Sequence, residues 1–254
     1  MPELPTISVP GGQVEYQDIP GDAARAPLLF LHEGLGSVRL WRGFPERIAA
    51  ATGHRAVAYS RLGHGGSDPP PAPRTPRFMH EEAAVVVPAV RAALGLDRPV
   101  LIGHSDGASI ALLHAASAAV DGLVVMAPHV FVEELGLCEI EAARRRFDEQ
   151  DLRSRLARHH RDPDAAFRNW NDVWLDPEFR RWDLRGELAG ISCPVLAVQG
   201  TADPYGSTAH VTAIRDRVAG PVELLLLDGG HSPHLEHPDA VAAAITGFLA
   251  GLSR

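Results

Sequence analysis

The sequence contains no lysine, so every permanently cationic side chain is an arginine. Without lysine the chain has no side-chain amine that forms a Schiff base with a carbonyl compound. It also lacks the lysine that binds nucleotide phosphates in a Walker-type loop. These absences argue against pyridoxal-dependent chemistry and against phosphoryl transfer.

Cysteine and long apolar runs are also scarce. Only Cys138 and Cys193 are present, in unlike surroundings and without the spacing of metal ligands, so we expect reduced thiols that form neither a disulfide nor a catalytic pair. No apolar stretch approaches the roughly 20 residues that span a bilayer. The first five residues lack the basic segment and apolar core of a signal peptide. We therefore expect no membrane partner and a cytoplasmic protein.

Positive charge is in deficit, because 24 arginines face 32 acidic side chains and the net charge is −8. This balance argues against a nucleic-acid-binding surface. The rest of the composition is that of a globular protein, with 45% hydrophobic and 22% charged residues. A length of 254 residues fits one large domain, or one domain that carries an insertion.

Short apolar runs alternate with helical segments along most of the chain. The candidate strands are residues 6–9, 14–17, 27–31, 56–59, 99–102, 122–126, 194–199 and 222–227. The first two flank Pro10-Gly11-Gly12 and predict an antiparallel hairpin at a sheet edge. Candidate helices cover 41–51, 78–94 with a kink at Pro88, Ser105 to about 119, 207–218 and 238–249. This alternation predicts an α/β fold with a doubly wound, mostly parallel sheet of about eight strands.

The strand pattern stops between residues 130 and 190, where segments 141–146 and 152–158 look helical. We interpret residues 130–190 as a helical cap inserted over the sheet, and residues 1–129 and 191–254 as the core. Three tryptophans, Trp170, Trp174 and Trp182, gather in the insertion. They either pack inside it or form the roof of an apolar pocket.

A tight turn is predicted at Gly103-His104-Ser105-Asp106-Gly107, between a candidate strand and a helical run. Glycines two residues on either side of Ser105 let the backbone crowd there, which lifts the hydroxyl above the sheet. The start of the helix then points at this hydroxyl, so the Asp106 N–H is a natural donor to an oxyanion. Taken alone, the motif is equally consistent with an ordinary strand-to-helix connection.

Two further polar residues, Asp203 and His231, follow the last two candidate strands, where functional groups of such a sheet collect. A serine hydroxyl needs an imidazole base, and the imidazole needs a carboxylate that fixes its tautomer. The order Ser105, Asp203, His231 is one of the known orders of this arrangement. We predict these residues as nucleophile, acid and base.

Other histidines and one glutamate offer alternatives. His234 is a second candidate base, and either Glu133 or His129 is a second candidate for the role of Asp203. His231, His234 and His237 share a spacing of three, but neither cysteine nor clustered carboxylates accompany them, so we expect no metal.

Together these motifs resemble the α/β-hydrolase superfamily over nearly the whole chain. The family's oxyanion loop matches residues 32–37, its Arg-Gly-His-Gly-x-Ser stretch 61–67, its nucleophile turn 103–107, its acid loop 200–203 and its Gly-His pair 230–231. The resemblance implies the triad of Ser105, His231 and Asp203, and the cap. It also implies oxyanion donors at the N–H of Asp106 and of Gly34 or Leu35. We expect His64 and His129 to stabilise loops or line the pocket.

Two residues depart from the pattern of that family. Glu33 stands where relatives usually carry glycine, and Asp106 stands where a neutral side chain is common. Unpaired carboxylates there would oppose the negative charge that develops during acyl transfer. We therefore expect both to be turned away, hydrogen-bonded, or paired with a neighbour such as His104 or His129.

The sequence thus predicts a serine hydrolase without metal or cofactor, acting on a small carboxylic ester or lactone. Candidate pocket residues are Glu33, His129, Trp170 and Trp174. Carbon–carbon bond hydrolases and enol-lactonases use the same triad and remain alternatives. Serine at the turn speaks against epoxide hydrolases and haloalkane dehalogenases, whose relatives use aspartate there. A cofactor-free oxygenase or lyase with His231 as base, and a non-catalytic receptor, are the rivals from other classes. A homodimer is left open.

Overall fold

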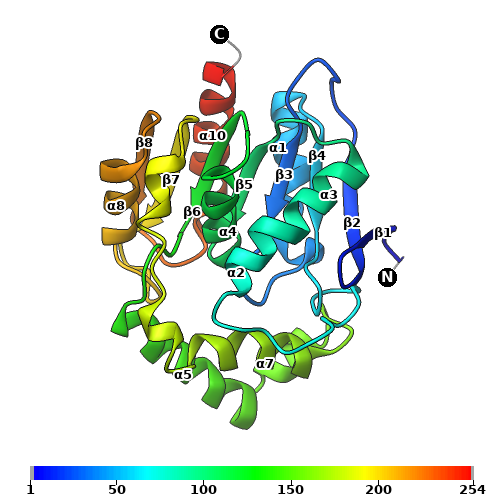
Figure 1. The fold of residues 1–254 in the computed structure, drawn as a ribbon, viewed down its shortest axis with the longest axis vertical. Helices are drawn as coiled ribbons and strands as arrows, with labels where there is room; N and C mark the ends of the chain where they lie inside the picture. Colours follow the sequence, from blue (N-terminus) through cyan, green and yellow to red (C-terminus); the bar gives the residue numbers. More distant parts are fainter. Residues whose placement is uncertain (1–2, 253–254) are drawn as a thin grey trace.

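The computed structural model describes residues 3–252. Within this range an eight-stranded sheet has the order β1-β2-β4-β3-β5-β6-β7-β8 (Figure 1). The strands are β1 (Thr6–Val9), β2 (Gly12–Ile19), β3 (Leu28–Leu31), β4 (Ala56–Tyr59), β5 (Val100–His104), β6 (Gly122–Met126), β7 (Val195–Gly200) and β8 (Val222–Leu227). The pairs β1–β2 and β2–β4 are antiparallel, and the other neighbours are parallel. The prediction of a mostly parallel sheet with a hairpin at its edge is confirmed.

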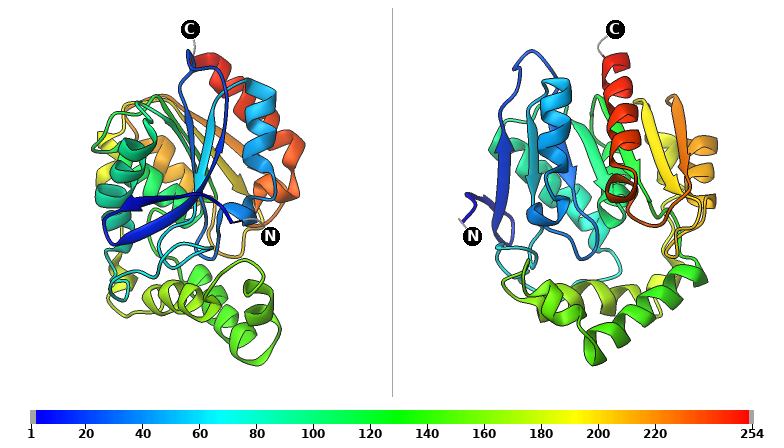
Figure 2. Two further views of the ribbon diagram at one scale, coloured as in Figure 1. Left: turned by 90° about the vertical axis from the view of Figure 1, so that its right-hand side faces the viewer. Right: turned by 180° about the vertical axis from the view of Figure 1, so that it is seen from behind.

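Helices cover both faces of this sheet. They are α1 (Phe44–Thr52), α2 (Phe78–Glu81), α3 (Val87–Leu94), α4 (Asp106–Ala115), α8 (Ala209–Arg217), α9 (Pro233–Glu236) and α10 (Pro238–Leu252). Leu28 and Phe30 of β3 pack into the core under α1 and α10, whereas Leu29 and Leu31 pack into the core under α3, α4 and α8. Figure 2 shows α1 and α10 together on one face of the sheet. Because both faces are buried, the central strands are apolar throughout.

The predicted helix at 78–94 is present but irregular. A π-helical turn, η2 (Glu82–Val86), separates α2 from α3. Pro88 has no N–H to donate to the carbonyl four residues earlier, and its ring crowds that carbonyl. The predicted kink therefore takes the form of a widened turn just before the proline. The helix after Ser105 ends at Ala115, four residues earlier than predicted, and the single turn of α9 was not predicted.

The segment between β6 and β7 lies at the end of the sheet opposite the C-terminus (Figure 1). It contains α5 (Glu134–Glu149), α6 (Leu152–Leu156), α7 (Pro163–Trp174) and the 3₁₀ turns η3 (Phe179–Arg181) and η4 (Glu187–Gly190). Asp162 caps α7 by accepting a hydrogen bond from the Ala165 N–H, as aspartate does at helix starts. The division into core and cap stays a prediction. No helix among residues 3–252 is both long and apolar enough to cross a bilayer.

Two leucines on strands provide a test of where the core lies. Leu101 on the central strand β5 is fully buried, whereas Leu226 on the edge strand β8 is 48% exposed. We expect Leu101→Ala to lower the free energy of unfolding by about 3 kcal/mol, because it leaves a cavity between close-packed neighbours. Leu226→Ala should change it by less than about 0.5 kcal/mol. Urea unfolding measures both, and equal losses would contradict this placement of the core.

Candidate active site

Ser105 is held in a strained turn between β5 and α4. Its φ of 52° and ψ of −121° lie in a region that non-glycine residues rarely adopt. The turn is tight because its glycines permit close approach. A Cβ on Gly107 would lie 2.0 Å from the carbonyl oxygen of Leu31, and a Cβ on Gly103 would lie 2.5 Å from the Cα of Ala108. Both positions therefore require glycine, as the sequence predicts.

The structure brings Ser105, His231 and Asp203 together. His231 Nε2 lies 2.9 Å from Ser105 Oγ, and His231 Nδ1 lies 2.8 and 2.9 Å from the carboxylate oxygens of Asp203. A carboxylate only accepts hydrogen bonds, so Nδ1 carries the proton and Nε2 is free to accept one from the hydroxyl. The side chain of Gln199 and the N–H of Tyr205 donate to the same carboxylate, each at 2.8 Å.

These partners keep Asp203 ionised. Burial acts to raise the pKa of Asp203, but the hydrogen bond and electrostatic interaction with His231 and the N–H of Tyr205 outweigh burial and hold the pKa below its usual range. Asp203 lies just beyond β7 and His231 just beyond β8. The carboxyl ends of parallel strands meet at one edge of the sheet, which is why residues so far apart in sequence meet here.

The alternative base and metal ligands lie elsewhere. His234 packs against the rings of Trp41 and Phe44, and burial lowers its pKa to about 3. His237 contacts the carbonyl of Asp228. Among residues 3–252 no group of three or more histidine, cysteine or acidic side chains is arranged to hold a metal ion.

The alternative acids also have other contacts. Glu133 accepts hydrogen bonds from Ser207 and lies 3.0 Å from His210 Nε2. His129 lies on the other side of the nucleophile, with Nε2 3.5 Å from Ser105 Oγ. Burial and neighbouring histidines hold its pKa well below the usual range, so its ring is neutral. Neither residue replaces Asp203 behind His231.

A turn after β3 presents the candidate oxyanion donors. The N–H of Gly36 bonds to the carbonyl of Glu33 at 3.0 Å, so Gly34 and Leu35 form the centre of a β-turn whose own hydrogen bond does not use their N–H groups. The N–H of Asp106 is the first of α4 and has no carbonyl one turn earlier to bond. All three residues line one cavity with Ser105.

The carbonyls of this turn are fixed from behind. The buried guanidinium of Arg61 donates to the carbonyls of His32 and Glu33. His64 Nε2 bonds to the carbonyl of Gly34 and His160 Nε2 to that of Leu35, each at 2.9 Å. The prediction of His64 as a loop-stabilising residue agrees with this contact. His160 was missed, because nothing in its sequence context links it to a loop 125 residues away.

Glu33 is paired with a histidine, as predicted. Its Oε2 lies 3.6 Å from His104 Nδ1, an ion-pair distance. Burial acts to raise the pKa of Glu33, but the contact with His104 and its charge outweigh burial and lower the pKa to about 2. His104 Nε2 in turn donates to the carbonyl of His231 at 2.7 Å. The pair thus links the turn after β3 to the loop that carries His231.

Asp106 has a partner that was not predicted. Its Oδ1 accepts a hydrogen bond from Trp174 Nε1 at 3.2 Å, and it pairs with neither His104 nor His129. The carboxyl is 1% exposed. Burial raises its pKa to about 6, and the charge of Arg61 and the bond from Trp174 only partly oppose this. No local pattern indicates this contact, because Trp174 comes from α7, in the segment between β6 and β7.

The cavity at Ser105 has a volume of about 220 Å³. It contains all four predicted pocket residues, and Ile140, Tyr205 and Ser232 in addition; its lining residues are Glu33, Gly34, Leu35, Ser105, Asp106, His129, Ile140, Trp170, Trp174, Tyr205, His231 and Ser232. Trp170 lies directly on the turn after β3, because a Cβ on Gly34 would come 2.2 Å from the indole ring.

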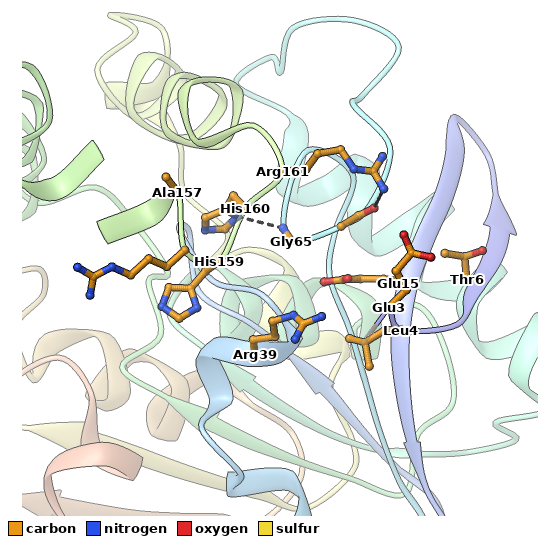
Figure 3. A pocket seen from close by; sticks show the side chains of 12 residues that line it. Glu3, Leu4, Thr6, Glu15, Arg39, Gly65, Ala157, His159, His160 and Arg161 are labelled. Carbon is orange, nitrogen blue, oxygen red and sulfur yellow. Dashed lines mark hydrogen bonds between the residues drawn. The ribbon is translucent and has the colours of Figure 1, made fainter. Parts of the chain in front are cut away.

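A larger hollow of about 350 Å³ lies between the end of α6 and the N-terminal strands (Figure 3). Arginines and carboxylates line it together, among them Arg39, Arg161, Glu3 and Glu15. None of Ser105, Asp203 and His231 lines it, so we place the chemistry at the smaller cavity.

Comparisons with known proteins agree with this architecture. A family model described as the alpha/beta hydrolase family matches residues 28–244. The human serine hydrolase BPHL is 26% identical over 96% of this chain and 85% of its own. Epoxide hydrolase A of Mycobacterium tuberculosis is 40% identical over 82 residues, which are 31% of this chain and 26% of that protein. The first curated relatives thus match over about a quarter to a third of their length. The enol-lactonase structure from Burkholderia xenovorans LB400 aligns with a TM-score of 0.75 at 20% identity, covering 97% of this chain and all of that one.

The raised pKa of Asp106 predicts a pH-dependent cost to stability. Between its usual value of 3.8 and about 6, the folded protein binds more protons at this site than the unfolded chain does. The contribution of Asp106 to stability therefore falls as pH rises through this window. The free energy of unfolding of Asp106→Asn minus that of the wild type should therefore rise by about 2 kcal/mol from pH 4 to pH 7.

Asp203→Asn is the matched control, because its expected slope has the opposite sign. The pKa of Asp203 is lowered in the folded protein, so its contribution to stability is present above the unfolded pKa and is lost on acidification. Urea unfolding of the three proteins from pH 3 to pH 7 measures both slopes. A gain for Asp106→Asn that is independent of pH would contradict the assignment.

Proposed function

Because the chain belongs to the alpha/beta hydrolase family, we propose that it is a serine hydrolase that cleaves a small carboxylic ester or lactone. The observation that carries this proposal is the chain of hydrogen bonds from Asp203 through His231 to Ser105, beside a cavity that Gly34, Leu35 and Asp106 line. Serine at the turn favours an acyl-enzyme mechanism, and it separates this site from the epoxide hydrolase that part of the chain resembles.

Attack on the substrate begins at Ser105. Its Oγ forms a bond to the carbonyl carbon while His231 Nε2 takes the hydroxyl proton, and Asp203 stabilises the imidazolium. The carbonyl oxygen becomes an oxyanion that accepts hydrogen bonds from the N–H of Asp106 and from the turn at Gly34 and Leu35. Such fixed donors stabilise the transition state because they need no reorganisation as charge develops.

Collapse of this intermediate breaks the bond to the leaving oxygen, which takes the proton from His231. The acyl group then remains on Ser105 as an ester. Water, deprotonated by His231, attacks that ester and releases a carboxylic acid, and the proton returns to Ser105. For a lactone the leaving oxygen stays in the same molecule, so the product is a hydroxy acid.

The helices of residues 130–190 serve as a cap in this proposal. Trp170 and Trp174 of α7 line the cavity and contact the two loops that hold the oxyanion donors. A cap that excludes water strengthens the electrostatic interactions inside the site. The small volume of the cavity, about 220 Å³, favours short acyl groups.

Loss of Ser105 is the direct test. We expect Ser105→Ala to lower kcat/KM on short p-nitrophenyl esters at least about 10⁴-fold, because removal of the nucleophile leaves only binding and the oxyanion donors. A fluorophosphonate probe should label the wild type at Ser105 alone. Ser154→Ala removes an exposed hydroxyl that bonds to the carbonyl of Asp151 and should retain full activity. Full turnover by Ser105→Ala would refute the proposal.

The carboxylates at the cavity predict selectivity against anionic substrates. A substrate carboxylate placed beside Glu33 and Asp106 meets two like charges at short range, and each of them, at about 4 Å, costs about 1 kcal/mol even at the dielectric constant of water and more in a buried site. We expect kcat/KM for methyl butanoate to exceed that for monomethyl succinate at least about tenfold at pH 7.5. An equal or higher value for the succinate half-ester would contradict this expectation.

A further inference from the structure

The cavity at Ser105 has an unbalanced set of charges. Its twelve lining residues include two carboxylates, Glu33 and Asp106, and no arginine. The positive charge of Arg61 acts on Asp106. The terminal N–H groups of Arg61, however, donate to the carbonyls of His32 and Glu33. His129, the histidine nearest the free side of the nucleophile, is neutral. A cationic group is therefore what the lining lacks.

Asp106 carries the stronger part of this imbalance. It is 1% exposed, and Trp174 donates to its Oδ1. No residue in the described range 3–252 donates to its other oxygen, Oδ2, although a carboxylate has about four acceptor positions. Buried carboxylates normally have charged or hydrogen-bonding partners, because burial without them is costly. Asp106 is thus an acceptor at the cavity with room for a donor from the ligand.

Aromatic rings complete the surroundings of the two carboxylates. Trp170, Trp174 and Tyr205 line the same cavity. The face of an indole or phenol ring attracts a cation, most strongly where water is excluded. Carboxylates together with aromatic faces form a suitable environment for an ammonium group, whereas a second carboxylate or a phosphate would be repelled.

The positions of the carboxylates determine where on the substrate the cation lies. Asp106 supplies its own N–H to the oxyanion site, and Glu33 directly precedes Gly34, whose N–H is another candidate donor. A group that contacts either carboxylate is therefore close to the scissile carbonyl. The cationic group therefore fits best as a substituent on the carbon next to that carbonyl.

Building on the proposed hydrolase function, we propose that the substrate is a small ester of an α-amino acid with a free ammonium group. Asp106 and Glu33 bind the ammonium, and the rings of Trp170 and Trp174 lie beside it in the same cavity. The ammonium supplies the donor that Asp106 lacks, and it offsets the negative charge beside the developing oxyanion. The acid released is an amino acid.

Two isosteric esters test the proposal. Methyl L-alaninate carries an ammonium group on the carbon next to its carbonyl, where methyl isobutyrate carries a methyl group. Each kcat/KM is divided by the rate constant for hydroxide hydrolysis of that ester, which removes the difference in intrinsic reactivity. At pH 7 we expect the corrected value for the alaninate to be at least about 30-fold higher, because a hydrogen-bonded charge pair contributes about 2 kcal/mol.

Variants assign this preference to the carboxylates. Asp106→Asn and Glu33→Gln each remove one negative charge at nearly constant shape, and each should lower the ratio of the two corrected values at least about tenfold. Asp216→Asn removes an exposed carboxylate that is paired with Arg215 on α8, far from the cavity, and should leave the ratio unchanged. The ratio is compared within each protein, so a general loss of activity does not affect it.

The outcomes separate the two proposals. A wild-type ratio near one, with hydrolysis that still depends on Ser105, would overturn the ammonium assignment and leave the hydrolase proposal intact. The wild-type ratio decides this even if a variant fails to fold. Hydrolysis of either ester that does not depend on Ser105 would overturn both. A high ratio that neither carboxylate variant lowers would show that the ammonium is bound elsewhere and would also overturn the assignment.

Discussion

The geometry of the site depends on one close contact, in which the start of α4 packs directly against the end of β3. Only glycine at position 107 permits this, since a Cβ there would lie 2.0 Å from the carbonyl of Leu31. With the helix this close, a single residue must turn the chain from β5 into α4, and Ser105 does so at a positive φ. A strained residue of this kind is stable only where its surroundings fix it. The same contact places the turn after β3 beside the serine hydroxyl.

The oxyanion turn is preorganised by groups on its far side. Its successive carbonyls accept hydrogen bonds from Arg61, His64 and His160, and its residues Gly34 and Leu35 line the cavity. Donors fixed in this way are effective because they are already oriented before charge develops in the reaction. His160 comes from the chain between α6 and α7, and it also accepts from the N–H of Gly65. The helices beyond β6 therefore support the site from behind as well as covering it.

Local patterns were sufficient to predict the sheet and the three central side chains. Apolar runs bounded by glycine and proline located β1, β4, β6 and β8 at their observed limits. Ser105, Asp203 and His231 were recognisable because each lies within four residues of the end of a strand. Contacts between distant segments were not predictable in this way. Spacing carries no information on which tryptophan of α7 reaches Asp106, or on which histidine reaches the carbonyl of Leu35.

The two carboxylates beside the oxyanion site have different surroundings and therefore different consequences. Glu33 faces His104, whose other nitrogen donates to the carbonyl of His231, so this carboxylate has a polar partner within the protein. Asp106 accepts a hydrogen bond from the neutral indole of Trp174, and burial raises its pKa to about 6 although the charge of Arg61 partly opposes this. Near neutral pH it is mostly ionised, and in the proposed mechanism its field opposes the oxyanion to which its own N–H donates. A neutral substrate has to overcome that field, whereas a substrate that carries its own cation cancels it. Under the proposed function, an arrangement that would weaken a general esterase thus becomes a means of selecting one class of ester.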